Sequence, residues 1–106
     1  IGDRALEQRK DSAYVFDLGQ AWKEMTGLPF VFAAWIANKK VSPEFTKGFN
    51  EANRYGLDRL HEVVEKYPYK TYDLFTYYKE NIDYRLDSKK MEGLKLYLKY
   101  LHQFGL

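Results

Sequence analysis

The run Asp17–Trp35 constrains the fold more than any other part of this 106-residue chain. Asp17 has the character of a helix N-cap, because its carboxylate can accept hydrogen bonds from free backbone N–H groups. Four apolar residues follow at positions i, i+3, i+4 and i+7, which places them on one helix face. Gly27 supplies a left-handed stop, and Pro29 prevents the helix from resuming. The apolar residues of this predicted helix are Leu18, Ala21, Trp22 and Met25.

Residues Phe30–Ala37 predict a strand that is apolar on both of its faces. Such a strand is typical of α/β sheets, in which helices cover both sides. Tyr14–Phe16 and Ile82–Leu86 are predicted to form shorter extended segments. One or two strands make a poor sheet on their own, so we expect residues outside this chain to complete it.

Helices dominate the second half of the sequence. Ser42 and Pro43 form a strong helix start, and helical spacing continues to about Lys66 with a bend expected near Gly56. Strands first and helices later suit the closing half of an α/β protein. Two further helices are predicted, one over Tyr72–Asn81 and one that runs from Ser88, as the N-cap, to Gly105.

Composition excludes several classes of function. The absence of cysteine excludes disulfides and thiolate metal sites. The net charge of +2, from 17 basic and 15 acidic residues, is too small to argue for nucleic acid or a membrane surface as a partner. The longest apolar stretch, Leu28–Ala37, is about ten residues, whereas a spanning helix needs roughly 20. We therefore expect no transmembrane segment, and no signal peptide is visible.

Several other patterns have ordinary structural explanations. His61 and His102 lie on predicted helices among charged residues, where solvated side chains are expected. The sequence therefore does not support a Ser/His/Asp catalytic site. No group of His and carboxylate residues has spacing typical of metal ligands, and no glycine-rich phosphate loop is present. Rings alternate with lysines over Lys66–Lys79, but a helix end that packs its rings explains this better than base stacking.

The last predicted helix carries an apolar stripe. A stripe at this spacing could bind a partner helix, although a core-facing role is favoured. Its members are Met91, Leu94, Leu98 and Leu101.

The opening residues Ile1, Gly2 and Asp3 are the one candidate for chemistry. An apolar-Gly-Asp sequence is typical of a strand end that enters a loop, where α/β proteins place ligand contacts. Gly2 would let a ligand approach the backbone closely, and Asp3 could hold a hydroxyl group or fix the loop. By pattern alone an ordinary turn is favoured. Since natural domains seldom begin at such a point, we also expect the polypeptide to begin upstream of Ile1.

The chain resembles the closing half of the chorismate dehydratases of the futalosine pathway of menaquinone biosynthesis. The resemblance is carried by IGDRAL at the start and by YVFDLGQAWKEMTGLPFVFAAW over residues 14–35. The helix after Ser42, the segment Tyr77–Leu86 and the terminal Met91–Leu106 also fit the layout of this family. The motif DLGxxWxxxTGLPFVFAxW is long and specific, and the resemblance covers nearly the whole chain.

The resemblance implies an α/β fold class, namely the C-terminal part of a two-lobed periplasmic-binding-protein-like (type II) fold that is mostly helical in this fragment. Residues 1–27 would form the end of the second lobe and the connecting helix. Residues 28–106 would form the return strand and the C-terminal helices. Members of the family are much longer than this chain, and their opening lobe carries most of the polar residues that handle substrate.

The resemblance also implies a cytoplasmic lyase that needs no cofactor. The enzyme would remove water from chorismate to give 3-[(1-carboxyvinyl)oxy]benzoate, holding this dicarboxylate in a closed, dry cleft between its lobes. Gly2 and Asp3 would lie near the cleft. Leu28, Pro29 and Phe30 would form a wall where the chain crosses between lobes. The catalytic acid and base would lie outside this chain, so we expect the isolated 106 residues to be inactive.

Three alternatives stay open at the level of sequence. A sister enzyme of the same fold acts on cyclic dehypoxanthine futalosine. It carries a His that serves as base at the position matching Gly2, and the Gly here favours the dehydratase. A ligand-binding or sensor domain of the same bilobed fold would use the cleft without catalysis, because fold does not fix chemistry. A stand-alone helical interaction module would need none of the site residues.

Overall fold

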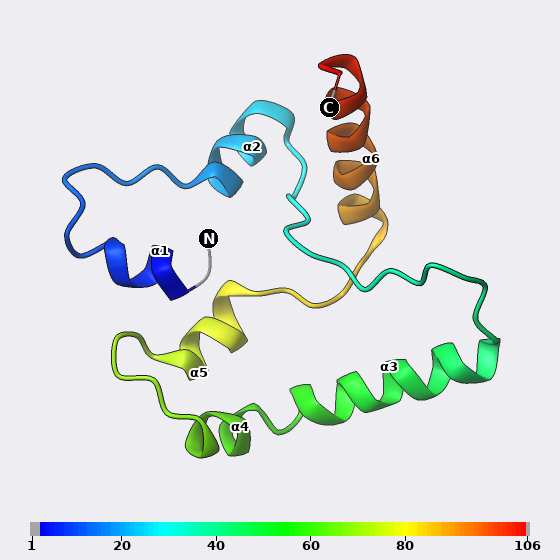
Figure 1. The fold of residues 1–106 in the computed structure, drawn as a ribbon, viewed down its shortest axis with the longest axis horizontal. Helices are drawn as coiled ribbons and strands as arrows, with labels where there is room; N and C mark the ends of the chain where they lie inside the picture. The colour runs from blue at the N-terminus through cyan, green and yellow to red at the C-terminus, as the bar shows by residue number, and fades with distance from the viewer. Residues whose placement is uncertain (1–2, 106) are drawn as a thin grey trace. The chain divides into compact units, whose positions relative to one another are not determined.

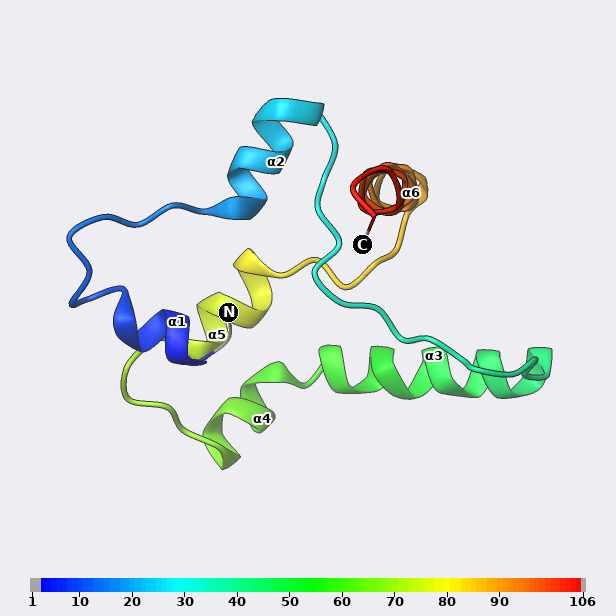
Figure 2. The ribbon, with the colours of Figure 1, turned by 45° about the horizontal axis from the view of Figure 1, so that its top comes forward.

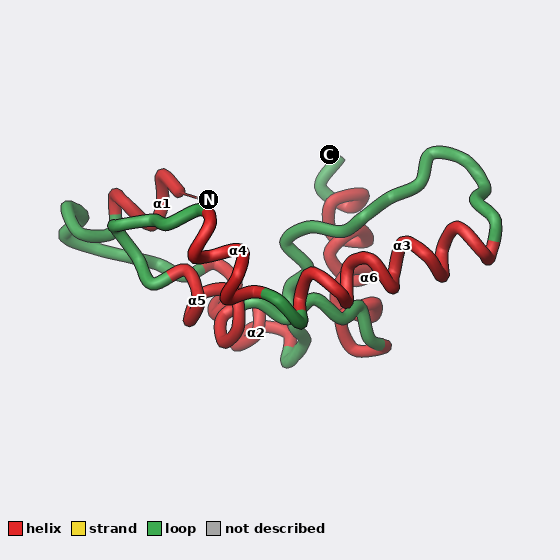
Figure 3. The backbone as a smooth tube through the Cα atoms, turned by 90° about the horizontal axis from the view of Figure 1, so that it is seen from below, coloured by secondary structure: helices red, strands yellow, loops and turns green. Residues whose placement is uncertain are grey.

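The computed structural model describes residues 3–105, and within that range it contains helices and no strands. Figure 1 shows the order of the helices along the chain, and Figure 3 shows them joined by loops. The elements are α1 (Asp3–Gln8), α2 (Leu18–Thr26), α3 (Pro43–Leu57), α4 (Leu60–Lys66), α5 (Leu74–Thr76), the π-helical turn η1 (Tyr77–Asn81) and α6 (Ser88–Gln103).

The chain divides into two compact units. The first contains the residues up to Asp11 together with Ile36–Asp83, and so includes α1, α3, α4, α5 and η1. The second contains Ser12–Trp35 together with the residues from Tyr84 onward, and so includes α2 and α6. Each unit therefore joins two segments that are distant in sequence. The expected lobe boundary between residues 27 and 28 concerns the whole protein and stays a prediction.

Helix α2 forms where the sequence predicted it, and both of its predicted caps are present. The Asp17 carboxylate accepts hydrogen bonds from the N–H groups of Gly19 and Gln20, at 2.9 and 3.0 Å. Gly27 adopts the left-handed conformation with φ of 73°, and its N–H donates to the carbonyl of Lys23 at 2.8 Å. A glycine is needed at this position because a Cβ atom disfavours positive φ.

The long helix predicted after Ser42 is confirmed at its start and is interrupted near the predicted bend. The Ser42 hydroxyl accepts a hydrogen bond from the N–H of Phe45 at 3.1 Å. Helix α3 ends at Leu57, and α4 starts at Leu60 after a turn in which the Arg59 N–H donates to the carbonyl of Gly56 at 3.0 Å. The break therefore lies just after the glycine that weakens the helix.

The last two predicted helices form with changed details. The segment predicted as one helix over Tyr72–Asn81 forms the short α5 and the π-helical turn η1. Ser88 is the first residue of α6 and not its cap. Asp87 caps the helix instead, because its carboxylate accepts the N–H of Lys90 at 2.9 Å.

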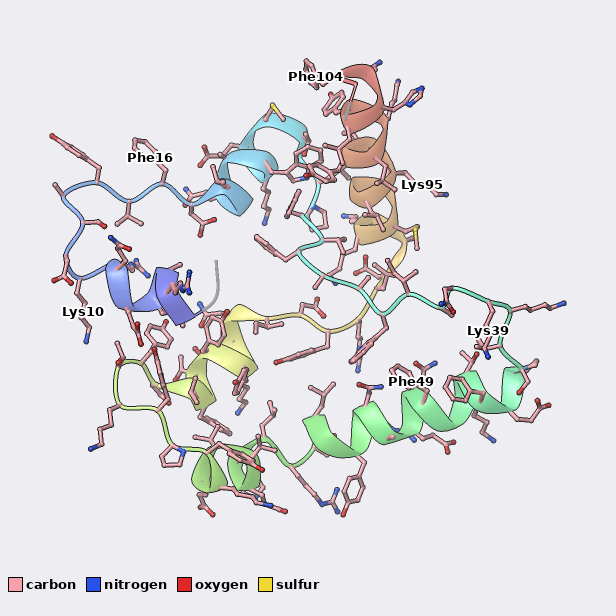
Figure 4. The ribbon with its side chains drawn as sticks, in the orientation of Figure 1. Lys10, Phe16, Lys39, Phe49, Lys95 and Phe104 are labelled. Carbon is pink, nitrogen blue, oxygen red and sulfur yellow. The ribbon has the colours of Figure 1, made fainter. Side chains whose placement is uncertain are left out.

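The three predicted strands are not formed within the described residues, where Tyr14–Phe16, Phe30–Ala37 and Ile82–Leu86 are irregular. A strand is stable only when a neighbouring strand receives its backbone hydrogen bonds. The side chains reflect the missing partners, since Phe16 is 86% exposed and Phe32 is 71% exposed. Figure 4 labels Phe16 on the segment before α2. The α/β fold class describes the whole protein and stays a prediction.

Trp22 is the centre of packing in the second unit and, among the described residues, the one apolar side chain that is buried, with 8% exposure. The rings of Phe30, Tyr97 and Tyr100 meet it edge to face, at centroid distances of 5.6, 5.8 and 6.1 Å. In Figures 1 and 2, α2, the segment after it and α6 lie side by side. Burial of the indole ring therefore holds three separate segments together.

Helix α6 packs through a face other than the predicted apolar stripe. Gly93, Tyr97 and Tyr100 recur at i, i+4 and i+7, and these residues meet Trp22 and the chain after α2. Leu98, a member of the stripe, is 53% exposed, whereas Met91, Leu94 and Leu101 are half-buried. The spacing of the stripe predicted the helix correctly, and three of its four members are half-buried, but it did not point to Tyr97 and Tyr100.

Gly93 is required for this close packing. A Cβ atom built on Gly93 would collide with the carbonyl oxygen of Pro29 and lie 3.6 Å from the Cβ of Leu28. The colliding atom belongs to the backbone, which cannot move aside as a flexible side chain could. Because Gly93 has no side chain, α6 can approach the segment Leu28–Phe30 closely.

We expect Gly93→Ala to lower the free energy of unfolding by about 1–3 kcal/mol, because the added methyl group overpacks the contact with Pro29. Gly48→Ala is the matched control, because Gly48 lies inside α3 with no atom within 4 Å of an added Cβ. That control should be stabilising by about 0.5–1 kcal/mol through helix propensity. Urea denaturation followed by circular dichroism measures both, and equal stability of the two variants would contradict the packing described here.

Candidate functional site

The predicted site residues fall into both units. Gly2 lies outside the described residues, and Asp3 is the first residue of α1 in the first unit. Leu28, Pro29 and Phe30 belong to the second unit, where each is half-buried. The structure therefore brings the last three together beside α6, whereas Asp3 belongs to the other unit.

The segment Leu28–Phe30 is fixed at its start by Thr26. The Thr26 hydroxyl donates to the carbonyl of Trp22 at 2.8 Å and accepts the N–H of Leu28 at 3.2 Å. One side chain thus bonds back to a carbonyl in the last turns of α2 and also receives the N–H of the chain as it leaves the helix. The expected role of this segment as a cleft wall stays a prediction, but its backbone position is strongly determined.

An aromatic cluster surrounds this segment and consists of Trp22, Phe30, Phe32, Tyr97 and Tyr100. Phe30 lies 4.9 Å from Phe32 and 5.0 Å from Tyr97 between ring centroids, and both pairs are edge to face. Pairs of this geometry stabilise a fold by about 0.5–1.5 kcal/mol each beyond burial of area. The Phe32 ring also covers the first turn of α2, since a Cβ on Gly19 would lie 2.7 Å from its Cζ. Phe30 is therefore held by its neighbours on two sides.

Trp22 carries a buried donor without an acceptor. Its Nε1 is inaccessible to solvent. Among the side chains that the structure describes, this is the buried polar atom that has no hydrogen-bond partner. A buried indole N–H usually finds a partner, and leaving one unmade costs about 1–3 kcal/mol. The aromatic cluster thus combines an apolar surface with one unused hydrogen-bond donor.

A shallow depression lies along the first turns of α3, in a region that the sequence patterns did not single out. Lys47, Asn50 and Arg54 share one helix face there, at spacings of three and four residues. The full lining consists of Val41, Pro43, Thr46, Lys47, Asn50, Glu51 and Arg54. Every lining residue is exposed, so the depression offers mixed charge at a wet surface and not a built binding site.

The carboxylates with perturbed pKa values lie at helix N-termini. The hydroxyl of Thr76 donates to Asp73 and lowers the pKa of that carboxyl. The backbone N–H and then the ammonium group of Lys90 lower the pKa of Asp87, and its own backbone N–H lowers the pKa of Glu44. All three groups are on the surface, where lowered values fit capping. None of them is prepared to act as a general acid near neutral pH.

The histidines are solvated, as the sequence indicated. His61 has a 63% exposed side chain with its Nε2 4.0 Å from a Glu62 carboxylate oxygen, and His102 is exposed in the last turn of α6. Across residues 3–105, no three His, Cys, Asp or Glu side chains gather as metal ligands would. In the same range no helix combines the length and apolar character needed to cross a bilayer.

Comparison with known proteins identifies the family. A family model described as menaquinone biosynthesis matches residues 1–103. The chain belongs to the menaquinone biosynthesis family. A chorismate dehydratase of Thermus thermophilus is 34% identical over 106 residues, which cover 92% of this chain and 38% of that protein. A chorismate dehydratase of Campylobacter jejuni is 32% identical over 107 residues, which cover 93% of this chain and 46% of that protein.

Membership of the menaquinone biosynthesis family confirms the resemblance found in the sequence. This chain spans less than half the length of the two curated relatives. The family match covers both the Gly2-Asp3 pair and the segment Leu28–Phe30. No solved structure matches the chain at a significant level.

We expect the two tryptophans to report separately on the aromatic cluster. In a Trp35→Phe variant the remaining Trp22 should emit at short wavelength and resist quenching by acrylamide, because it is 8% exposed. In a Trp22→Phe variant of the isolated 106-residue chain the remaining Trp35, which is 82% exposed, should be quenched readily. Trp22→Phe should also lower the free energy of unfolding by about 1–2 kcal/mol through lost burial. Equal quenching of the two variants would show that Trp22 is not buried.

We expect Asp87 to make part of the stability of α6 dependent on pH. Its pKa is lowered in the folded chain from the ordinary 3.8, so its contribution is present above 3.8 and is lost as the pH falls through the lower folded value. Asp87→Asn keeps a good N-cap but cannot titrate. Acid unfolding followed by circular dichroism should show a smaller loss of stability below pH 3.8 in the variant. Superimposable acid transitions would rule out this contribution.

Proposed function

We propose that the full-length protein carrying this chain is a chorismate dehydratase, a hydro-lyase that forms 3-[(1-carboxyvinyl)oxy]benzoate in the futalosine route of menaquinone biosynthesis. The observation that carries the proposal is the identity of 34% and 32% to two chorismate dehydratases over more than nine-tenths of the chain. The Gly at position 2, in place of the basic His expected of the sister enzyme, also favours the dehydratase.

The proposed architecture is the C-terminal part of a two-lobed periplasmic-binding-protein-like fold. In that arrangement Phe30–Ala37 would pair with strands contributed by residues outside this chain. The exposure of Phe32, Trp35 and Ile36 supports this, because a run of large apolar side chains seldom stays uncovered in a folded protein.

The proposed reaction removes one molecule of water from the substrate. A ring carbon loses its hydrogen as a proton, the carbon–oxygen bond breaks with its electron pair on the departing hydroxyl group, and the two combine as water. The ring gains its third double bond and becomes aromatic, which supplies the driving force. The protein then has to hold a dicarboxylate, exclude bulk water and assist the proton and the hydroxyl group as they leave. No cofactor is needed for these steps.

Within this chain, Asp3 and Gly2 are the residues proposed to lie at the substrate. A glycine permits close approach of the substrate to the backbone, and a carboxylate can accept a hydrogen bond from a substrate hydroxyl group. Leu28, Pro29 and Phe30 are proposed as an apolar wall of the cleft. We place the reaction in the cytoplasm, with chorismate as the small-molecule partner.

We expect the full-length protein to convert chorismate to a product lighter by one water, detected by mass spectrometry. Asp3→Asn should lower kcat/KM about tenfold, because the neutral amide is a weaker acceptor for a substrate hydroxyl group. Asp11→Asn, which changes an exposed carboxylate of the same unit, is the matched control and should leave kcat/KM unchanged. The isolated 106-residue chain should be inactive.

Two results would overturn parts of this proposal. If the full-length protein does not remove water from chorismate, the proposed dehydratase activity is rejected. Turnover of chorismate by the 106 residues alone would reject the placement of the acid and base outside this chain.

A further inference from the structure

We propose that one face of α2 is the docking surface for an apolar β-strand of the full-length protein, supplied by residues outside these 106. This face, the α2 stripe, consists of Leu18, Ala21 and Met25. The inference rests on the proposed two-lobed architecture and deepens it by naming where a further strand lies. It is independent of the chemistry of dehydration.

The α2 stripe is apolar and open to solvent. Leu18 is 78% exposed and Met25 is 68% exposed, and Ala21 on the same face is also exposed. Helix α2 has nine residues, too few for an isolated helix to be stable in water, so its stability has to come from packing of its apolar face. Trp22 is the one residue of α2 that is buried. The stripe is therefore the apolar part of α2 that still needs a covering element.

The geometry of the helix separates the α2 stripe from the side that is already packed. Successive residues turn by about 100° around the helix axis, so the three members of the stripe lie within about 60° of one another. Gly19 and Trp22 lie on one side of the stripe. The segment after α2 occupies that side, because the Phe32 ring covers Gly19 and the Phe30 ring meets Trp22 edge to face at 5.6 Å.

The widths of helices and strands indicate what fits the α2 stripe. A helix is about 10 Å wide and neighbouring strands are about 4.8 Å apart, so one helix covers about two strands of a sheet. The predicted strand over residues 30–37 would account for one of them, beneath Gly19 and Trp22. The second would lie beside it beneath the stripe and would pair with it through backbone hydrogen bonds. The element that fits the stripe is therefore an apolar strand.

The extended segment Tyr14–Phe16 cannot supply this strand. Asp17 follows Phe16 directly and is already the N-cap of α2, which leaves no residues for a turn back beneath the helix. Connections between a strand and the next helix usually take roughly two to six residues. The other helix of the second unit, α6, packs on the Trp22 side of α2.

The length of the relatives points to the source of the strand. The chain covers 38% of one chorismate dehydratase and 46% of the other, so more than half of each relative lies outside the match. A polypeptide of that length has the residues to complete a sheet beside α2. We therefore assign the strand to the same polypeptide and not to a second copy.

The first test places the photo-crosslinking amino acid p-benzoylphenylalanine at Met25 of the full-length protein. On irradiation we expect a cross-link within one polypeptide to a peptide outside the 106 residues, identified by mass spectrometry. The same probe at Gln20, which is exposed on the opposite face of α2, is the matched control and should form no such cross-link. A cross-link between two copies, a cross-link elsewhere within the 106 residues, or no cross-link from position 25 would each overturn the inference.

The second test, Met25→Gln, measures burial without a probe. Gln has a helix propensity close to that of Met but places an amide group in the α2 stripe. We expect the midpoint of thermal unfolding to fall by about 4–8 °C in the full-length protein and by less than about 2 °C in the isolated chain, where Met25 is already exposed. Lys23→Gln, at an exposed position of the same helix, is the matched control and should change neither midpoint. Equal shifts of the full-length protein and the isolated chain would contradict the docking.

Both readouts are independent of activity, so the docking surface and the proposed function can fail separately. A full-length protein that cross-links from Met25 as expected but does not remove water from chorismate would retain the docking surface and reject the dehydratase activity. Conversion of chorismate without a cross-link from Met25 would reject the docking surface and retain the activity.

Discussion

Burial of the Trp22 indole is the interaction on which the second unit depends. Its ring is met by Phe30 from the segment after α2 and by Tyr97 and Tyr100 from α6, so one side chain joins residues that are far apart in sequence. Gly93 permits the close approach that this burial requires. Other large apolar side chains in the same unit are exposed, including Phe16, Phe32 and Trp35. The packing of the unit is thus concentrated at one point and is not spread over a broad core.

Features that depend on neighbouring residues were predictable from the sequence. The caps at Asp17, Gly27 and Ser42 arise from hydrogen bonds within three or four residues, and all three are present. The shift of the α6 cap from Ser88 to Asp87 is a choice between two adjacent residues of similar capping ability. The break after Gly56 was anticipated for the same local reason. Patterns within a few residues are sufficient because the competing interactions are equally short in range.

Features that depend on distant partners were not predictable in the same way. A doubly apolar run such as Phe30–Ala37 indicates where a strand could form, but pairing needs a second segment that accepts its hydrogen bonds. The contribution of Tyr97 and Tyr100 to the packing of α6 was also not predicted, because the stripe of Met91 and Leu94 is more apolar by composition than these two residues. The aromatic residues meet Trp22 through ring geometry, which a count of apolar positions does not detect. The family, in contrast, was recognisable because its motif is long.

The candidate site shows the same division between local and distant determinants. The sequence singled out Asp3 from its place after a glycine, and it placed Leu28–Phe30 after a helix stop, both of which are local signals. The helices of the first unit that pack together are consecutive, α3 with α4, α4 with α5 and α5 with η1. The hydrogen bond between Tyr69 and Glu7 is, in contrast, a contact between residues far apart in the sequence, and patterns within a few residues do not predict such a contact.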